Sequence, residues 1–196
     1  MKHAELFLAE LRADGPAERP VTLNILGATA LAVQVDFARG TRDADVLQTL
    51  DLNEAARAHL LELAGPGTTL AARWKLHVQI VPNGIPFLPH PPTWNRVALP
   101  GAPTAVSIRA LDVVDVVVSK LTRFSANDRS DIDAMISAGH VSHDRLIARF
   151  LSAVDGFLGD AREGELPRYV DNLHEVERDA FGVEESEIEL PDWIDR

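Results

Sequence analysis

Residues 21–47 read VTLNILGATALAVQVDFARGTRDADVL, and this stretch decides the fold. Apolar and polar side chains alternate over residues 21–26, which predicts a half-buried strand. The chain then reaches Gly27 and a run of small residues, which favours a helix that continues to about Phe37. A polar bend leads into a second apolar stretch that begins at Asp43. We therefore expect a strand that delivers the chain to a glycine turn, a helix and a second strand.

The rest of the sequence predicts a mixed α/β front half and a helical rear half. Asp51 to Glu54 resembles a capping box, and Ser142 is the expected N-cap of a later helix. We expect an α/β core over residues 1–111, a helical region over 112–182 and an acidic tail over 183–196. The expected strands lie at residues 75–81, 96–99 and 105–111, and the expected helices at 4–13, 54–64, 113–124, 129–137, 143–158 and 166–181.

The distribution of charge matters more than the net charge of -11. Residues 160–196 hold thirteen acidic and four basic side chains, so the remainder of the chain is nearly neutral. Local groups of Arg and Lys can therefore bind phosphate, whereas unspecific adhesion to nucleic acid is not expected. The acidic end is open to interpretation as a solvated tail, a cap or a mimic of a polyanion, and a solvated tail is the usual behaviour of such a block.

The composition of the chain limits its cellular compartment and the kinds of metal site and cross-link that it can form. With 46% hydrophobic residues, the chain can bury a substantial core, and it has no cysteine for disulfides or thiolate zinc sites. No apolar run approaches the ~20 residues that span a bilayer, and the N-terminus lacks a signal-peptide core. We expect a cytoplasmic protein with no membrane partner.

The chemistry-bearing feature is the pair of aspartates at Asp43 and Asp45. Two carboxylates two residues apart on a strand project to the same side and can share a hard cation, Mg²⁺ or Mn²⁺. Such a cation, held by carboxylates and substrate phosphates, is the usual way to align a nucleoside triphosphate. Upstream, Gly27 permits close backbone approach, helix N-terminal amides suit a phosphate, and Thr29 adds a hydroxyl. A solvated turn at the aspartates and an ordinary strand-to-helix turn at Gly27 are the simpler alternatives.

These residues resemble a known family. Leu26-Gly27-Ala28-Thr29-Ala30-Leu31 followed by Arg39-Gly40-Thr41-Arg42-Asp43-Ala44-Asp45-Val46-Leu47 is similar to the opening of minimal nucleotidyltransferases of the DNA polymerase beta superfamily. The branch that includes the abortive-infection (AbiEii-like) toxins is the most similar. There, a lysine on a helix precedes an Arg/Asp-rich helix, which residues 119–123 and 128–133 resemble. The match covers scattered blocks between about Val21 and Gly139.

The resemblance implies a mixed sheet flanked by helices and assigns roles to named residues. Binding of the nucleotide falls to Gly27, Ala28, Thr29, Arg39, Thr41, Lys120 and Arg123. Catalysis falls to Asp43, Asp45, Lys120 and Asp131, with the first two also holding the metal. The implied partners are a nucleoside triphosphate, an RNA (tRNA-like) or protein acceptor, and a partner protein of a toxin–antitoxin system.

Two departures from the family pattern limit these assignments. Ala28 stands at the second position of the glycine turn, which is a small change. The third metal carboxylate of the superfamily is not evident, because the expected strand at residues 75–81 presents Lys75, His77 and Gln79 instead. A one-metal enzyme, a site rearranged around Asp131 or Asp133, and a catalytically degenerate nucleotide-binding protein all remain open.

Two further readings compete with nucleotidyl transfer. A haloacid-dehalogenase-type phosphatase also uses an Asp-x-Asp string, but it needs a buried strand feeding the first aspartate, whereas a polar bend precedes Asp43. An antitoxin-like or scaffold member of the same fold would explain the missing third acid and the acidic C-terminal region.

Overall fold

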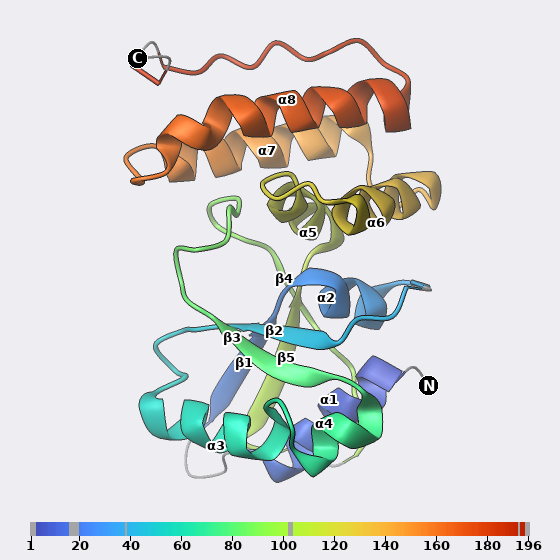
Figure 1. Cartoon of the computed structure of the whole chain (residues 1–196), viewed down its shortest axis with the longest axis vertical. Coiled ribbons are helices and arrows are strands. Elements are labelled where there is room, and N and C mark those ends of the chain that lie inside the picture. Colours follow the sequence, from blue (N-terminus) through green and yellow to red (C-terminus); the bar gives the residue numbers. More distant parts are fainter. Residues whose placement is uncertain (1–2, 16–19, 38, 102–103, 192, 195–196) are drawn as a thin grey trace. The chain divides into compact units, whose positions relative to one another are not determined.

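The computed structural model describes residues 3–15, 20–37, 39–101, 104–191 and 193–194. The chain forms two compact units. Unit 1 comprises Met1–Pro86 and Trp94–Asp112, and unit 2 comprises Phe87–Thr93 and Val113–Arg196. Unit 1 contains a mixed sheet with helices and unit 2 is helical, so the expected mixed α/β class is confirmed (Figure 1).

Unit 1 is built on a five-stranded sheet in the order β3-β2-β1-β5-β4. Parallel pairing joins β1 to β5 and β2 to β3, whereas β1 with β2 and β4 with β5 are antiparallel. The period-two alternation seen in the sequence accounts for β1 and β5, which bury alternate side chains. The strands are β1 (Val21–Ile25), β2 (Asp43–Leu47), β3 (His77–Val81), β4 (Trp94–Arg96) and β5 (Val106–Leu111).

The sheet has one apolar face and one polar face. Ile25 pairs with Val46 and with Ala110, and all three side chains are buried. Side chains at the alternate positions point to the opposite side, and we call this side the polar face. Its polar members are Thr22, Asn24, Asp43, Asp45, His77, Gln79, Arg96, Ser107 and Arg109, and the same register places Leu47, Val81, Trp94 and Leu111 on this face.

Four helices belong to unit 1, namely α1 (His3–Asp14), α2 (Gly27–Gln34), α3 (Glu54–Ala64) and α4 (Thr69–Trp74). The helices α1, α3 and α4 contact one another and gather along one side of the sheet (Figure 1). Helix α2 follows β1 directly and contacts both β2 and β5. The core therefore lies between the apolar face of the sheet and the buried sides of the helices, which include Phe7, Leu8 and Leu60.

Several boundaries in unit 1 differ from the sequence predictions. Helix α2 ends at Gln34 rather than Phe37, because Val35 is extended. The side-chain amide of Gln34 donates to the carbonyl oxygens of Ala30 and Leu111. The expected capping box at Asp51 is wrong: Asn53 caps α3 by accepting from the amide of Ala56.

The remaining differences in unit 1 concern helix α4 and the strands β3 and β4. Helix α4 was not predicted, and its C-cap, Lys75, has a left-handed φ of 52°, so β3 begins at His77 rather than Lys75. The strand expected at 96–99 instead spans Trp94–Arg96.

Unit 2 contains α5 (Val113–Lys120), α6 (Ala126–Ser137), α7 (His143–Phe157) and α8 (Leu166–Val176), with a 3-10 turn at Glu163–Glu165 and a π-helical turn at Glu177–Phe181. The predicted helix 113–124 stops at Lys120, and α6 starts at Ala126 rather than Arg129 because Ser125 caps it. The predicted helix 166–181 divides into α8 and the π-helical turn. Ser142 stands at the N-cap of α7 but its side chain makes no capping hydrogen bond.

Two buried ionic contacts hold loops onto these helices. Asp115, fully buried, accepts two hydrogen bonds from Arg149 at 2.6 Å each and one from the amide of Thr93 at 2.7 Å. At the other contact, the buried carboxylate of Glu177 accepts hydrogen bonds from the amide and hydroxyl of Ser186 and contacts His143. The segment after Gly182 thereby runs back along α8 (Figure 1).

No helix among the described residues is long and apolar enough to cross a membrane.

Candidate functional site

The two aspartates lie at the beginning of β2, on the polar face. In the parallel pairing with β3, Asp43 lies opposite His77 and Asp45 opposite Gln79. The Nε2 atom of His77 is 3.2 Å from Oδ1 of Asp43, and the Asp43 side chain is 48% exposed. Solvent and ligands can therefore reach this carboxylate, and an imidazole and an amide stand where a third acid was sought.

Gly27 brings the turn after β1 against the second aspartate. Its φ is +62°, a left-handed conformation that favours glycine, and a β-carbon at this position would stand 2.6 Å from Oδ2 of Asp45. The amide of Leu26 also donates to the carbonyl oxygen of Asp45 at 2.8 Å. The turn, the helix N-terminus and the carboxylate are therefore neighbours, as the sequence predicts.

Both threonines assigned to the site bond to the backbone of Asp43. The hydroxyl of the buried Thr29 donates to the Asp43 carbonyl oxygen at 2.8 Å, which ties α2 to β2. Thr41 accepts from the Asp43 amide at 3.3 Å and closes the bend before the strand. Ala28 is buried, and the Arg39 guanidinium lies 5.8 Å from the ring centroid of Phe37. The two threonines thus hold the backbone of Asp43 in place.

The donor set fits one Mg²⁺ ion shared with a nucleotide better than a closed protein cage. Within the described parts of the chain, no group of three or more His, Cys, Asp or Glu side chains is arranged to hold a metal. Mg²⁺ is commonly held by one or two carboxylates plus substrate phosphates, which is the set that Asp43, Asp45 and a bound triphosphate would supply. The imidazole of His77 and the amide of Gln79 do not add the negative charge that a second ion requires.

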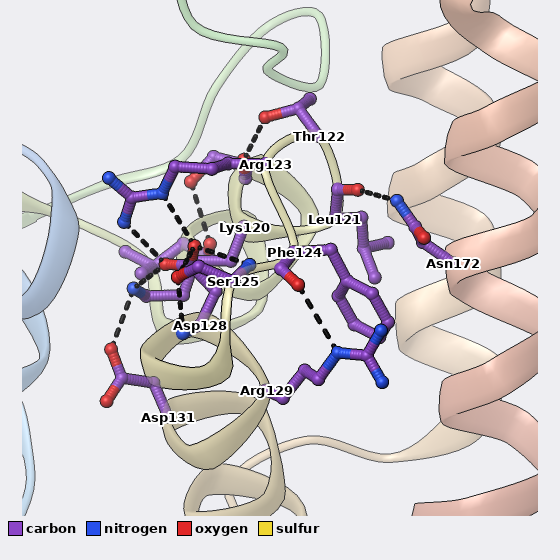
Figure 2. A network of polar contacts seen from close by, with 12 residues as sticks. Lys120, Leu121, Thr122, Arg123, Phe124, Ser125, Asp128, Arg129, Asp131 and Asn172 are labelled. Atoms are coloured by element: carbon purple, nitrogen blue, oxygen red, sulfur yellow. Dashed lines mark hydrogen bonds and ion pairs between the residues drawn. The ribbon is translucent and has the colours of Figure 1, made fainter.

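Lys120 and its partners form a separate cluster in unit 2 (Figure 2). The Lys120 ammonium lies 2.9 Å from Asp128 Oδ1 and 2.7 Å from Asp131 Oδ2, and all three residues are buried. Arg123 reaches the same Asp128 carboxylate through two hydrogen bonds, although its own side chain is 74% exposed. Lys120 and Asp131, both of which the resemblance assigns to catalysis, are therefore in direct contact.

Asp128 is the centre of this cluster and was missed in the sequence. Burial alone would raise its pKa, but hydrogen bonds from Arg123, Ser125 and Lys120 outweigh that effect and hold the pKa well below its usual range. Asp128 also completes a capping box with Ser125 at the start of α6. The signal was Ser125-Ala126-Asn127-Asp128, in which aspartate stands where the usual capping box has Glu or Gln.

A family model described as "Nucleotidyltransferase of unknown function (DUF6036)" matches residues 6–178. The chain belongs to this nucleotidyltransferase family. The matched range includes the glycine turn, both aspartates of β2 and the Lys120 cluster, and it stops before the last acidic stretch. No curated protein and no solved structure matches the chain.

Membership in the family gives the polar face its chemical context. Nucleotidyl transfer needs a site for the phosphates and carboxylates that hold a cation beside them. In this family member, Gly27, just after β1, lies beside the Asp45 carboxylate of β2.

Proposed function

We propose that the protein is a metal-dependent nucleotidyltransferase that moves a nucleoside monophosphate from a nucleoside triphosphate to a hydroxyl of an acceptor. The observation that carries this proposal is the close approach of the Gly27 turn to the Asp45 carboxylate, because it brings a backbone turn suited to phosphate beside a carboxylate suited to a cation. The family assignment supports the general class of reaction.

The reaction is an in-line displacement at the α-phosphorus. The acceptor oxygen forms a bond to that phosphorus, the bond to the β-phosphate oxygen breaks, and pyrophosphate leaves with the electron pair. Gly27 and the first amides of α2 hold the phosphates, and the Asp43–His77 pair offers an acceptor for the hydroxyl proton. Asp43 and Asp45 would hold Mg²⁺ or Mn²⁺, which when bound neutralises phosphate charge.

The Lys120 cluster supplies a further role. We assign Lys120 and Arg123 of unit 2 to phosphate binding, and Asp131 to orienting the lysine, with which it is in contact at 2.7 Å. Both assignments rest on the resemblance to the AbiEii-like branch. That resemblance also motivates an RNA or protein acceptor and a place in a toxin–antitoxin pair. The lack of cysteine supports the proposal of a cytoplasmic location.

The test is whether purified protein consumes any of the four α-labelled nucleoside triphosphates with Mg²⁺ or Mn²⁺. We expect label to enter an acceptor and pyrophosphate to be released, and we expect the Asp43→Asn, Asp45→Asn double variant to do neither. Full transfer by that variant would remove the aspartates from the mechanism.

A catalytically degenerate nucleotide-binding or antitoxin-like protein is the second candidate. It is favoured by the absence, among described residues, of a third acid beside the aspartates and by the burial of Lys120, which is 7% exposed. This candidate predicts that triphosphate binds but that no label transfers to self, partner protein or RNA with any nucleotide.

A phosphatase of the haloacid-dehalogenase type is less well supported. Asp43 is the first residue of β2, so no buried strand leads into it to present its carboxylate as a nucleophile. Release of phosphate from simple phosphomonoesters, lost in Asp43→Asn, would revive that alternative.

A further inference from the structure

Two arginines of the polar face lie directly opposite each other on β4 and β5. Arg96 pairs with Arg109 in the antiparallel register, and both residues are exposed. Like charges directly opposite each other destabilise a strand pair. Neither guanidinium makes a hydrogen bond or ion pair with any residue in the described parts of the chain. The fold thus carries a repulsion that its own described side chains leave uncompensated.

Among the described residues, the side chain of Arg109 makes no hydrogen bond to its neighbour on β1. Asn24 lies beside Arg109 in the parallel register, and its side-chain oxygen Oδ1 is buried without a hydrogen-bond partner among described residues. A guanidinium turned inward would satisfy that oxygen, yet Arg109 leaves it unmet. Instead, Arg109 remains exposed to solvent beside the Thr22 and Ser107 hydroxyls, which are bonded to each other at 3.0 Å.

The position of the pair relates it to the aspartates within the same sheet. Strand β1 separates β5 from β2, and the register sets Arg109 level with Leu47, two residues along β2 from Asp45. Strand spacing and rise then put the backbones of Arg109 and Asp45 roughly 12 Å apart across the polar face. An extended chain of phosphates could span that separation.

We propose that Arg96 and Arg109 bind phosphates of a single-stranded RNA acceptor whose terminal hydroxyl lies at Asp43 and Asp45. Two adjacent guanidiniums on an otherwise near-neutral unit complement a repeating anion, and a polynucleotide backbone repeats its phosphate at each residue. The naming of the acceptor rests on the proposed transfer reaction. Binding of RNA to the arginines does not, because it requires neither metal nor triphosphate.

Binding is therefore measured without transfer, by fluorescence anisotropy of a labelled single-stranded RNA in chelator over a series of salt concentrations. We expect Arg96→Gln with Arg109→Gln to weaken binding on the order of tenfold near 0.1 M salt. We also expect it to lower the magnitude of the log–log salt slope by about 1.4, the value for two lost contacts to a single strand. The Arg96→Lys, Arg109→Lys variant should retain the wild-type slope.

The matched control removes two positive charges from the helices of unit 1. Arg57→Gln with Arg73→Gln, on α3 and α4, makes the same change in net charge and should alter RNA affinity by less than about twofold if the arginine pair is the site. Equal losses in both double variants would mean diffuse attraction and overturn the proposal. An unchanged slope in the folded Arg96→Gln, Arg109→Gln protein would also overturn it.

Two further arms separate this inference from the proposed function. Asp43→Asn with Asp45→Asn should bind the RNA in chelator at least as tightly as wild type, because it removes two negative charges beside the RNA end. RNA binding with no transfer by any protein would therefore contradict the proposed transferase and leave the arginine site supported. Displacement of the RNA by inorganic phosphate at equal phosphate concentration would show that the arginines bind an isolated anion, and it would overturn the proposal of a single-stranded RNA ligand. Transfer to a protein acceptor alone, with no RNA bound, would do the same.

Discussion

A β-carbon at Gly27 would stand 2.6 Å from Oδ2 of Asp45, so the glycine turn and the carboxylate occupy adjoining space. The absence of a side chain at residue 27 therefore allows the left-handed backbone conformation and also leaves room for the Asp45 carboxylate. Substitution at this residue tests both, and another glycine of unit 1 allows the two effects to be separated.

Gly27→Ala should lower the free energy of unfolding by about 2 kcal/mol and reduce triphosphate binding more than tenfold. A left-handed φ costs a residue with a β-carbon roughly 1–2 kcal/mol, and the methyl group would also displace Asp45. Gly67→Ala is the control, because Gly67 has φ +83° but nothing within 4 Å of its β-carbon position. Denaturant unfolding and calorimetric titration check the two effects. Equal triphosphate affinity in the two variants would contradict a role for the contact.

Removal of both aspartates should abolish transfer without loss of stability. Asp43→Ala with Asp45→Ala removes two like charges on one face, so we expect a melting temperature equal to or above that of wild type. The contact of the half-exposed Asp43 with His77 is worth little in comparison. Asp51→Ala with Asp155→Ala makes the same charge change at exposed positions elsewhere and should keep full activity. A large fall in melting temperature in the first variant would show that the pair is structural.

Lys120 should contribute far more to stability than Arg123, although both bind Asp128. Lys120→Met leaves the buried Asp128 and Asp131 carboxylates without their shared ammonium, which should cost about 3–5 kcal/mol. Arg123→Met removes a mainly exposed side chain and should cost on the order of 1 kcal/mol. Urea unfolding of the two variants gives the comparison. Similar losses would indicate that burial does not govern this cluster.

Unit 2 should lose stability in acid through Asp128 and Glu177. Burial would raise the pKa of Glu177, but hydrogen bonds from Ser186 and His143 lower it, and Asp128 is lowered in the same manner. Carboxyls with a depressed folded pKa contribute stability above their unfolded value of about 4, and this is lost as the pH falls through the folded pKa.

The measurement is the free energy of unfolding from pH 7 downward for wild type, Asp128→Asn and Glu177→Gln. Each variant should have a flatter profile than wild type below about pH 4. Asp160→Asn is the control: hydrogen bonds from Arg162 lower the pKa of this carboxyl, but its side chain is partly exposed and solvent screens the pair, so its profile should flatten less than those of the two buried carboxyls. Parallel profiles in all four proteins would mean that other groups govern acid unfolding.

The loop at Phe87–Thr93 should depend on the Asp115–Arg149 pair. Arg149→Met leaves the fully buried Asp115 carboxylate without its guanidinium and removes the hydrogen bond to the Pro91 carbonyl oxygen. We expect a loss of about 3–5 kcal/mol and faster amide exchange at Thr93. Arg168→Met, which breaks an exposed pair with Glu165, should cost less than about 1 kcal/mol. Unchanged exchange at Thr93 would contradict the anchoring role.

The sequence predicted β1, β2, β3 and β5 and the glycine–aspartate neighbourhood because each has a local signal. Alternation marks β1 and β3, and Gly27 and Asp43 stand within one strand–turn–helix–strand unit. Helix α4 was not predicted, because six residues are too few to show the periodic spacing of apolar side chains that indicates a helix. The burial of Lys120 could not be predicted from the sequence, because long charged side chains are seldom buried. Its partners also lie eight and eleven residues later in the chain, in the next helix.

The Ser186–Glu177 contact sets a practical limit on shortened forms of the chain. Residues 183–191 contain no helix or strand, and a sequence-based choice of boundary would discard them as an acidic appendage. A protein cut after Gly182 would lose both the amide and the hydroxyl that Ser186 presents to Glu177, whose side chain is fully buried. Fragments prepared for crystallisation or partner screening should therefore retain Ser186, even though the family match ends at residue 178.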